Sequence, residues 1–350
     1  MVNNRILTLI LIFGLWLGFM HAPTGNSTDN NKMVASNDAK FMTIALGTGG
    51  GLYEGNLSAY LLAPLDSSNF ISLDAGTLLT GLQAARHHGN LDNVFVPQSS
   101  PLNVETWFMR EHIKAYLITH AHLDHIAGLV LNSSIDKPSK PIIGLNKTVQ
   151  DVEHHLLNWH VWPNFGDRGN SPYLSKYYYV TAPADTMIPI ANTDMSVTAL
   201  PLSHSLTTST AFLIEHEGHY VVYAGDTGAD ELENSEHLTA LWQKVVPLIQ
   251  KKRLHAMFLE VAYPNEQPEE FLYGHMTPKW LMHSLSQLAN LVDGSNPKQA
   301  LQDLTVIVTS IKPSILENVN VNTTIANQLA ELNDLGIQFV FATQGQRIIF

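Results

Sequence analysis

The sequence contains no cysteine among its 350 residues. Disulfide bonds, thiolate metal ligands and cysteine nucleophiles are therefore excluded. Charged residues are also few, at 14% of the chain, whereas hydrophobic residues make up 45%. A chain with this balance can bury a large core, which excludes a disordered protein.

Basic side chains are scarce. The chain has 19 Lys and Arg against 31 Asp and Glu, a formal charge of -12. Double-stranded nucleic acid and anionic membrane surfaces both require a basic partner surface, so we expect neither as a partner. A small anionic substrate held by metal ions remains compatible with this charge, because bound cations dominate their local field.

Long apolar runs are absent except at the N-terminus. There, Arg5 precedes an apolar run at 6–20, and residues 21–40 are polar. This pattern predicts a secretory signal peptide at 1–22, a polar linker at 23–40 and one folded domain at 41–350. We therefore expect a periplasmic or secreted protein without stable membrane association after cleavage. An uncleaved anchor is the alternative, because no clear small-x-small site precedes Pro23.

Short apolar runs bounded by Gly, Asp and Ser predict two β-rich halves. Strands are expected at 41–46, 58–62, 70–73, 115–118, 197–200, 210–215, 220–224, 256–261, 304–309, 338–341 and 347–350. Helical periodicity is present at 148–159, 238–252 and 279–292. This order predicts an α/β fold in which two sheets pack face to face and helices cover the outside.

One segment concentrates metal-binding side chains. Within six residues, directly after the apolar run at 115–118, the chain places His120, His122, Asp124 and His125. Imidazole and carboxylate groups are ligands that suit zinc. In a loop at the end of a strand, we expect His120 and His122 to face one metal while Asp124 and His125 face another.

Three later residues complete the candidate site. His204 and Asp226 each follow a predicted strand, and His275 precedes a predicted helix. Loops at the ends of regular elements converge on a rigid scaffold, so the three side chains can meet the histidine motif. A single His or Asp at such a place is usually a cap or turn residue; the prediction depends on their occurring together.

The order of these residues resembles the metal-ligand order of the metallo-β-lactamase superfamily, from about Phe41 onward. The stretch HAHLDHIAGLVLNS at 120–133 is more narrowly similar to the signature of the class II cyclic-nucleotide phosphodiesterases. The runs GHMTP at 274–278 and LEVAYP at 259–264 are also similar to that family. The resemblance implies an αββα sandwich and makes residues 41–350 a metallo-hydrolase domain.

The resemblance also implies a ligand set for two zinc ions. The first ion would be bound by His120, His122 and His204, and the second by Asp124, His125 and His275, with Asp226 bridging. Three or four ligands to each ion leave a position for water. Sequence does not separate zinc from manganese or iron in a site of nitrogen and oxygen donors.

A mechanism follows from two adjacent metal ions. They would lower the pKa of a bridging water, and the resulting hydroxide would attack the phosphorus of a 3',5'-cyclic nucleotide. The product would be a 5'-nucleoside monophosphate, with cyclic AMP as the expected substrate and cyclic GMP as a second candidate. Asp124 and Asp226 are both candidates to protonate the leaving 3' oxygen.

Other residues are weaker candidates. Asp74 and Glu260 are candidates to orient metal-bound histidines, although Asp74 also suits a turn. Trp162 and Phe165 could stack on a purine or close the core under a long loop. Lys312, after a predicted strand, could contact the cyclic phosphate or be a solvated surface lysine.

Three alternatives share parts of this pattern. A tRNA 3'-processing nuclease has the same ligand order but needs a basic exosite, which a charge of -12 disfavours. A lactonase uses the same seven ligands, and a β-lactamase is a shorter relative. A non-catalytic zinc-binding protein would enclose its metal without an open position. The oligomeric state is not predicted.

Overall fold

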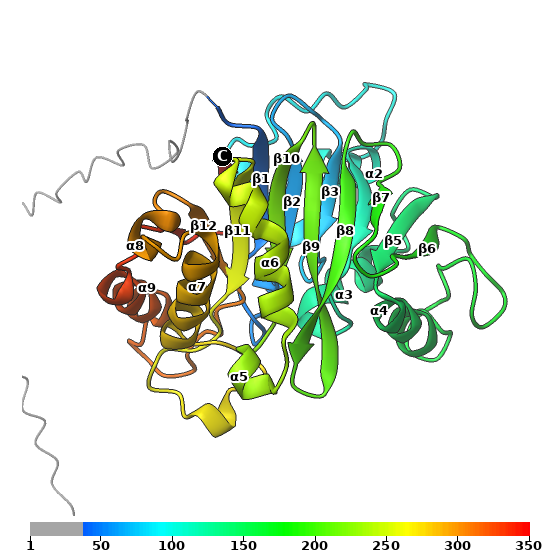
Figure 1. Cartoon of the computed structure of the whole chain (residues 1–350). Coiled ribbons are helices and arrows are strands. Elements are labelled where there is room, and N and C mark those ends of the chain that lie inside the picture. Colours follow the sequence, from blue (N-terminus) through cyan, green and yellow to red (C-terminus); the bar gives the residue numbers. More distant parts are fainter. Residues whose placement is uncertain (1–37) are drawn as a thin grey trace, which may run out of the picture. The chain divides into compact units, whose positions relative to one another are not determined.

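The computed structural model describes residues 38–350. The expected signal peptide at 1–22 and nearly all of the linker at 23–40 lie outside the described residues. Two seven-stranded sheets form the centre of the domain, with helices on their outer faces (Figure 1). The predicted α/β sandwich is confirmed.

The first sheet has the order β14-β1-β2-β3-β4-β5-β6. Its strands are β1 Phe41–Gly47, β2 Ala59–Pro64, β3 Phe70–Leu73, β4 Ile113–Leu117, β5 Lys140–Gly144, β6 Tyr177–Thr181 and β14 Arg347–Ile349. From β14 to β3 the neighbours are antiparallel, and from β3 to β6 they are parallel. The central strands are covered on both faces, which explains their nearly continuous apolar sequences.

The second sheet has the order β13-β12-β11-β10-β9-β8-β7. Its strands are β7 Met187–Pro189, β8 Ser196–His204, β9 Thr207–His216, β10 His219–Ala224, β11 Leu254–Glu260, β12 Thr305–Thr309 and β13 Gln338–Val340. The β8–β9 ladder continues to its tip, where His204 pairs with Thr207. In Figure 1 this hairpin projects at the lower end of the sheet.

An aromatic core fixes the two sheets against each other. The ring centroids of Tyr60 on β2 and Phe258 on β11 lie 5.2 Å apart. Tyr223 on β10 lies 5.7 Å from Phe258 and 6.2 Å from Tyr60, and all three rings are buried. Aromatic pairs at these separations add to the stability gained from burial. The strand ends of both sheets are therefore held in a fixed relation.

Helices cover both outer faces. Over the first sheet pack α1 Leu79–His87, α2 Val104–Glu111, α3 Leu123–Asn132 and α4 Asn146–Asp151. Over the second sheet pack α6 His237–Gln250, α7 Pro278–Val292 and α9 Val321–Leu332. Short elements are η1 Glu54–Asn56, η2 Val152–Leu156, α5 Asp230–Glu233, η3 Glu269–Phe271 and α8 Pro297–Ala300. Among residues 38–350, no helix has the length and apolar character needed to cross a membrane.

One predicted helix differs in form. The helix expected at 148–159 is α-helical only to Asp151, continues as the π-helical turn η2 and ends at Leu156. Two adjacent histidines, His154 and His155, lie exposed in this turn, so the burial that would hold a longer amphipathic helix is limited.

Candidate active site

The histidine motif lies where β4 passes into α3. His120 is in the short connection, and His122 occupies the N-cap position of α3. Asp124 and His125 therefore lie in the first helical turn, which corrects the prediction that the whole motif is a loop. The helix forms because Ile126, Leu129 and Val130 bury one face against the first sheet.

The later candidates reach the same place from the second sheet. His204 ends β8, Asp226 follows β10, and His275 lies between β11 and α7. Three groups of side chains each bring their donor atoms within 4.8 Å of one another: His120, His122 and His204; His120, His125 and Asp226; and His204, Asp226 and His275. These six residues form the ligand cluster. Asp124 is beside it, with Oδ2 at 3.8 Å from His125 Nε2.

Hydrogen bonds orient four of the five imidazoles. His204 Nδ1 donates to the Gly274 carbonyl at 2.8 Å, which leaves Nε2 as the free ring atom. His125 Nδ1 lies 2.7 Å from Asp74 Oδ2, and His275 Nδ1 lies 2.8 Å from Glu260 Oε1. A partner that accepts at Nδ1 selects the tautomer whose Nε2 lone pair can bind a metal.

The fourth imidazole is oriented by a threonine. Thr119 Oγ1 donates its proton to Asp74 Oδ2 at 2.9 Å, so its oxygen accepts from His120 Nδ1 at 3.0 Å. The unprotonated His120 Nε2 then faces His122 Nδ1 at 3.0 Å. Such a close approach of two ring nitrogens is favourable when they share a proton or a cation.

Two buried atoms of the ligand cluster are unsatisfied. His125 Nε2 and Asp226 Oδ1 have no hydrogen-bond partner among the described residues, although both side chains are almost fully buried. His125 Nε2 lies 3.2 Å from the other Asp226 oxygen without the alignment of a hydrogen bond. A buried polar atom without a partner is costly, and a metal ion would satisfy both. The donor set and these free atoms therefore fit a divalent metal.

Asp74 is the centre of a buried network. Its Oδ1 accepts from the Thr119 backbone at 2.8 Å, and its Oδ2 accepts from the Tyr223 hydroxyl at 2.9 Å, in addition to the contact with His125. Its backbone has a φ of +53°, a conformation that Asp tolerates better than most residues. Thr119 and Tyr223 were not predicted from sequence. The position of Thr119 directly before His120 and the inward alternation of β10 are the signals that could have found them.

Glu260 holds the opposite side of the ligand cluster. Its Oε1 also accepts from the Thr227 backbone at 2.9 Å. Its Oε2 accepts from the backbones of Ala262 at 3.1 Å and Met276 at 3.2 Å. The carboxylate thus links the residue after Asp226 to the residue after His275. It fixes two loops as well as one imidazole.

Burial and charge push the pKa values in opposite directions. Burial, together with His125, places the pKa of His120 well below its ordinary value, and burial also lowers the pKa of His122. For His125, burial lowers the pKa, but the carboxylates of Asp226 and Asp74 raise it well above the ordinary value. Burial raises the pKa of Asp226, but His125 brings it well below its usual range.

The weaker candidates lie in different places. Lys312 Nζ donates to the Gly50 carbonyl at 3.0 Å, in the loop after β12. Trp162 Nε1 donates to Ser133 Oγ at 3.0 Å, and its partly buried side chain packs against the core cluster of the first sheet, to which buried Phe165 belongs. The structure does not bring these two aromatic rings into the ligand cluster, and their stacking on a purine stays a prediction.

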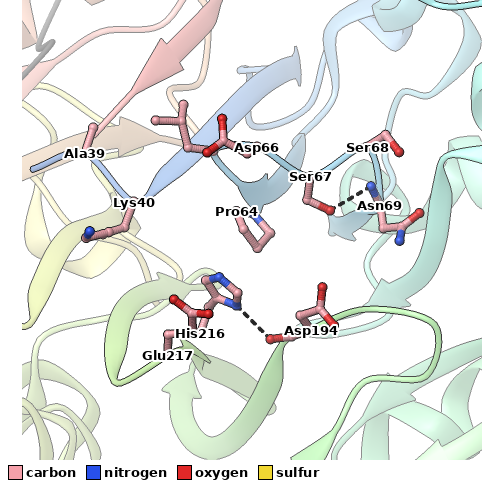
Figure 2. Close-up of a pocket in the computed structure, with 11 residues that line it drawn as sticks. Ala39, Lys40, Pro64, Asp66, Ser67, Ser68, Asn69, Asp194, His216 and Glu217 are labelled. Atoms are coloured by element: carbon pink, nitrogen blue, oxygen red, sulfur yellow. Dashed lines mark hydrogen bonds between the residues drawn. The ribbon is translucent and has the colours of Figure 1, made fainter.

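A cavity lies at the ends of the strands opposite the ligand cluster. It has a volume of about 560 Å³ and is lined by residues such as Lys40, Pro64 and His216, at the start of β1 and the ends of β2 and β9 (Figure 2). The His216 ring donates from Nδ1 to the Asp194 carbonyl at 2.8 Å. None of the predicted site residues lines this cavity.

Known proteins are similar to this chain over most of its length. The family model for class-II cAMP phosphodiesterases matches residues 35–345. A 3',5'-cyclic-nucleotide phosphodiesterase of Aliivibrio fischeri is 40% identical, over 90% of this chain and 94% of the relative. A probable 3',5'-cyclic-nucleotide phosphodiesterase of Yersinia pestis is 35% identical, over 88% of each chain.

Solved structures show the same fold. Unliganded yeast PDE1 superposes with a TM-score of 0.76 at 23% identity, covering 89% of this chain and all of that one. A metallo-β-lactamase fold protein from Bacillus subtilis gives a TM-score of 0.55 at 15% identity, covering 89% of this chain and all of that one. The predicted metallo-β-lactamase fold is confirmed. The chain belongs to the class-II cAMP phosphodiesterases, and it is a cyclic-nucleotide phosphodiesterase.

Proposed function

We propose that this enzyme hydrolyses 3',5'-cyclic AMP, and cyclic GMP as a second substrate, to the 5'-nucleoside monophosphate at a dinuclear zinc site. The observation that carries the metal part of the proposal is the pair of unsatisfied buried atoms, His125 Nε2 and Asp226 Oδ1, inside a cluster of five imidazoles. All donors are nitrogen or oxygen, a set that suits zinc and also admits manganese or iron.

The ligands divide as follows. His120, His122 and His204, which form one of the three groups, would hold one ion. His125 and His275, with Asp124 beside them, would hold the other, and Asp226, which belongs to the other two groups, would lie between the ions. When bound, two such ions lower the pKa of a shared water, supply hydroxide near neutral pH and neutralise the phosphate charge. Asp74, Glu260 and the Gly274 carbonyl keep three of the imidazoles pointing their Nε2 atoms inward.

The leaving 3' oxygen requires a proton, and we assign its delivery to Asp124. The proton that water loses in becoming hydroxide would pass to this carboxylate, which would then give it to the 3' oxygen. The Asp124 side chain is 19% exposed, whereas that of Asp226 is 2% exposed. Asp226 Oδ2 also lies between His125 at 3.2 Å and His275 at 3.6 Å. Asp124 is therefore on the side that substrate and solvent can reach, while Asp226 is confined among the imidazoles.

The proposal is tested with the purified protein. We expect 5'-AMP as the product of cyclic AMP hydrolysis, resolved by chromatography, and about two zinc ions per chain in the same sample. His122→Ala should abolish turnover while the far-UV circular dichroism is retained, because His122 is a half-exposed ligand outside the core. Full activity of this variant would contradict the proposal.

The substrate is a small molecule, a cyclic nucleotide, as the family match indicates. A sample that carries both metals but hydrolyses neither cyclic AMP nor cyclic GMP would contradict the proposal.

We also propose that the enzyme is exported and acts in the periplasm or outside the cell. The basis is the apolar run at 6–20 after Arg5, followed by polar residues. Fractionation of expressing cells, with the N-terminus of the mature protein sequenced, tests this. A full-length protein found in the cytosol would contradict it.

A further inference from the structure

A small cavity lies next to the ligand cluster, between the loop after β1 and the loop after β12. Its volume is about 130 Å³, and it is lined by Thr48, Gly49, Gly51, Tyr53, Asn56, Ile311, Pro313 and Asn322. Pockets that enclose a whole ligand usually measure about 300–1,000 Å³. This cavity therefore suits one part of a nucleotide. Resting on the proposed function, we propose that it binds the nucleobase of the cyclic nucleotide, with Tyr53 stacking on the base and Asn322 reading its edge.

The first argument is position. A Cβ atom placed on Gly51 would lie 3.8 Å from Asp124 Oδ2, so the wall of the cavity contacts the edge of the metal site. On the other wall, Lys312 stands between Ile311 and Pro313, and its backbone donates to the Ala262 carbonyl at 3.0 Å. The Ala262 backbone in turn donates to Glu260, the carboxylate that holds His275. A ribose separates the base of a cyclic nucleotide from its phosphorus. A base in this cavity would place the phosphate over the ligand cluster.

The second argument is rigidity. Gly49 forms bridges both to Leu57 and to Ile311, and the Gly50 backbone donates to the Ile311 carbonyl at 3.0 Å. A Cβ on Gly50 would lie 2.3 Å from the Ser310 carbonyl oxygen, so only glycine permits this approach of the two loops. Lys312 Nζ also links the two loops, because it donates a hydrogen bond to the Gly50 carbonyl. A preformed cavity costs little ordering free energy when a ligand enters.

The third argument is the chemistry of the walls. Ile311 and Pro313 supply an apolar floor, and Tyr53 presents an aromatic side chain that is 60% exposed. The Asn56 side-chain amide already has partners in Thr48. Asn56 Oδ1 accepts from the Thr48 backbone N–H at 3.0 Å, and Asn56 Nδ2 donates to the Thr48 hydroxyl at 3.2 Å. The Asn322 side chain, by contrast, is exposed in the first turn of α9. A primary amide offers one acceptor and two donors, which match the edge of a purine.

A second exposed aromatic residue provides the control. Tyr273 is 62% exposed and precedes Gly274, whose carbonyl holds His204. It is thus also beside the ligand cluster, but it lies in the loop after β11 and does not line the cavity. Its ring lies 6.3 Å from that of Phe271. Tyr53 and Tyr273 are matched in residue type and exposure and differ in whether they line the cavity.

The experiment compares variants of the zinc-loaded enzyme on cyclic AMP, cyclic GMP and bis(p-nitrophenyl) phosphate, a phosphodiester without a nucleobase. Tyr53→Ala should raise KM for both cyclic nucleotides by about 10-fold with little change in kcat, because stacking is lost for any base. Tyr53→Phe should restore KM, and Tyr273→Ala should leave it unchanged. Asn322→Ala should change the ratio of kcat/KM between cyclic AMP and cyclic GMP. All four variants should hydrolyse the base-free diester as the unaltered enzyme does.

The outcomes separate this proposal from the proposed function. An unaltered enzyme that cleaves the base-free diester but neither cyclic nucleotide would overturn both. An enzyme that cleaves cyclic nucleotides, with KM unchanged in Tyr53→Ala or raised instead in Tyr273→Ala, would overturn the nucleobase site alone. Equal losses of Tyr53→Ala on all three substrates would also overturn it, because the defect would then concern the metal site or the fold.

Discussion

Removing the Tyr223 hydroxyl should weaken zinc binding without touching a ligand. This hydroxyl donates to Asp74 Oδ2 at 2.9 Å, and the same oxygen lies 2.7 Å from His125 Nδ1. Burial and the nearby Asp74 carboxylate raise the pKa of Tyr223 well above its ordinary value, so the hydroxyl keeps its proton and donates it. Tyr223→Phe leaves the buried carboxylate with one donor fewer.

The magnitude follows from the charge of the acceptor. A hydrogen bond to a charged group contributes about 1.5–3 kcal/mol, so the variant should lose about 2 kcal/mol of unfolding free energy. Residues that orient a metal ligand from behind typically change metal affinity by about 10–100-fold. We expect a loss in this range, measured by competition with a zinc chelator, and urea unfolding curves for the stability.

Tyr60→Phe is the matched control. The Tyr60 hydroxyl is buried in the same aromatic core but has no hydrogen-bond partner among the described residues, and its ring centroid lies 6.2 Å from that of Tyr223. Its removal should leave zinc affinity unchanged and unfolding free energy equal or higher. If both variants lost zinc affinity equally, the effect would belong to core packing, and the argument through Asp74 would be refuted.

Three other perturbations have expected outcomes. Glu260→Gln places an amide nitrogen among backbone donors from Thr227, Ala262 and Met276, so zinc affinity and melting temperature should both fall, and unchanged values would contradict the role of Glu260. Chelation should abolish hydrolysis and lower the melting temperature, and added zinc should restore both, whereas chelator-resistant turnover would count against metal catalysis. Burial and neighbouring His219 lower the pKa of His255 from 6.5 to about 4, so the unfolded chain binds more protons and stability should fall as pH drops through this window. Because His255 is only half-buried, the loss should be about 1 kcal/mol after allowance for solvent screening, and His255→Asn should flatten the urea-midpoint profile between these pH values.

The sequence predicted elements best where apolar runs were bounded by turn residues. The strand β3 has the predicted bounds, and α7 begins one residue earlier than expected. The strand β5 was not predicted, because it begins with Lys140 and Pro141. Lys140 Nζ is buried and lies 2.6 Å from Asp136 Oδ1. A hydropathy pattern does not predict that this ion pair allows a lysine to be buried in a strand.

Candidate metal ligands were easier to predict than the residues that support them. His204, Asp226 and His275 were predicted from their positions at element ends, and their donor atoms lie within 4.8 Å of one another. The Tyr223 contact with Asp74 joins residues 149 positions apart. A local sequence pattern cannot predict this hydrogen bond, because the two residues meet only when the two sheets pack together.

The division of the ligand cluster between the two sheets makes metal content a measure of assembly. His120, His122 and His125 come from the first sheet, whereas His204, Asp226 and His275 come from the second. The position of one set relative to the other depends on the aromatic core around Tyr60 and Phe258. A substitution that leaves a cavity in that core, such as Phe258→Ala, should shift the sets apart while both sheets and all helices persist. Such a variant would look folded by circular dichroism yet bind zinc poorly, so zinc content is the more sensitive assay of correct packing.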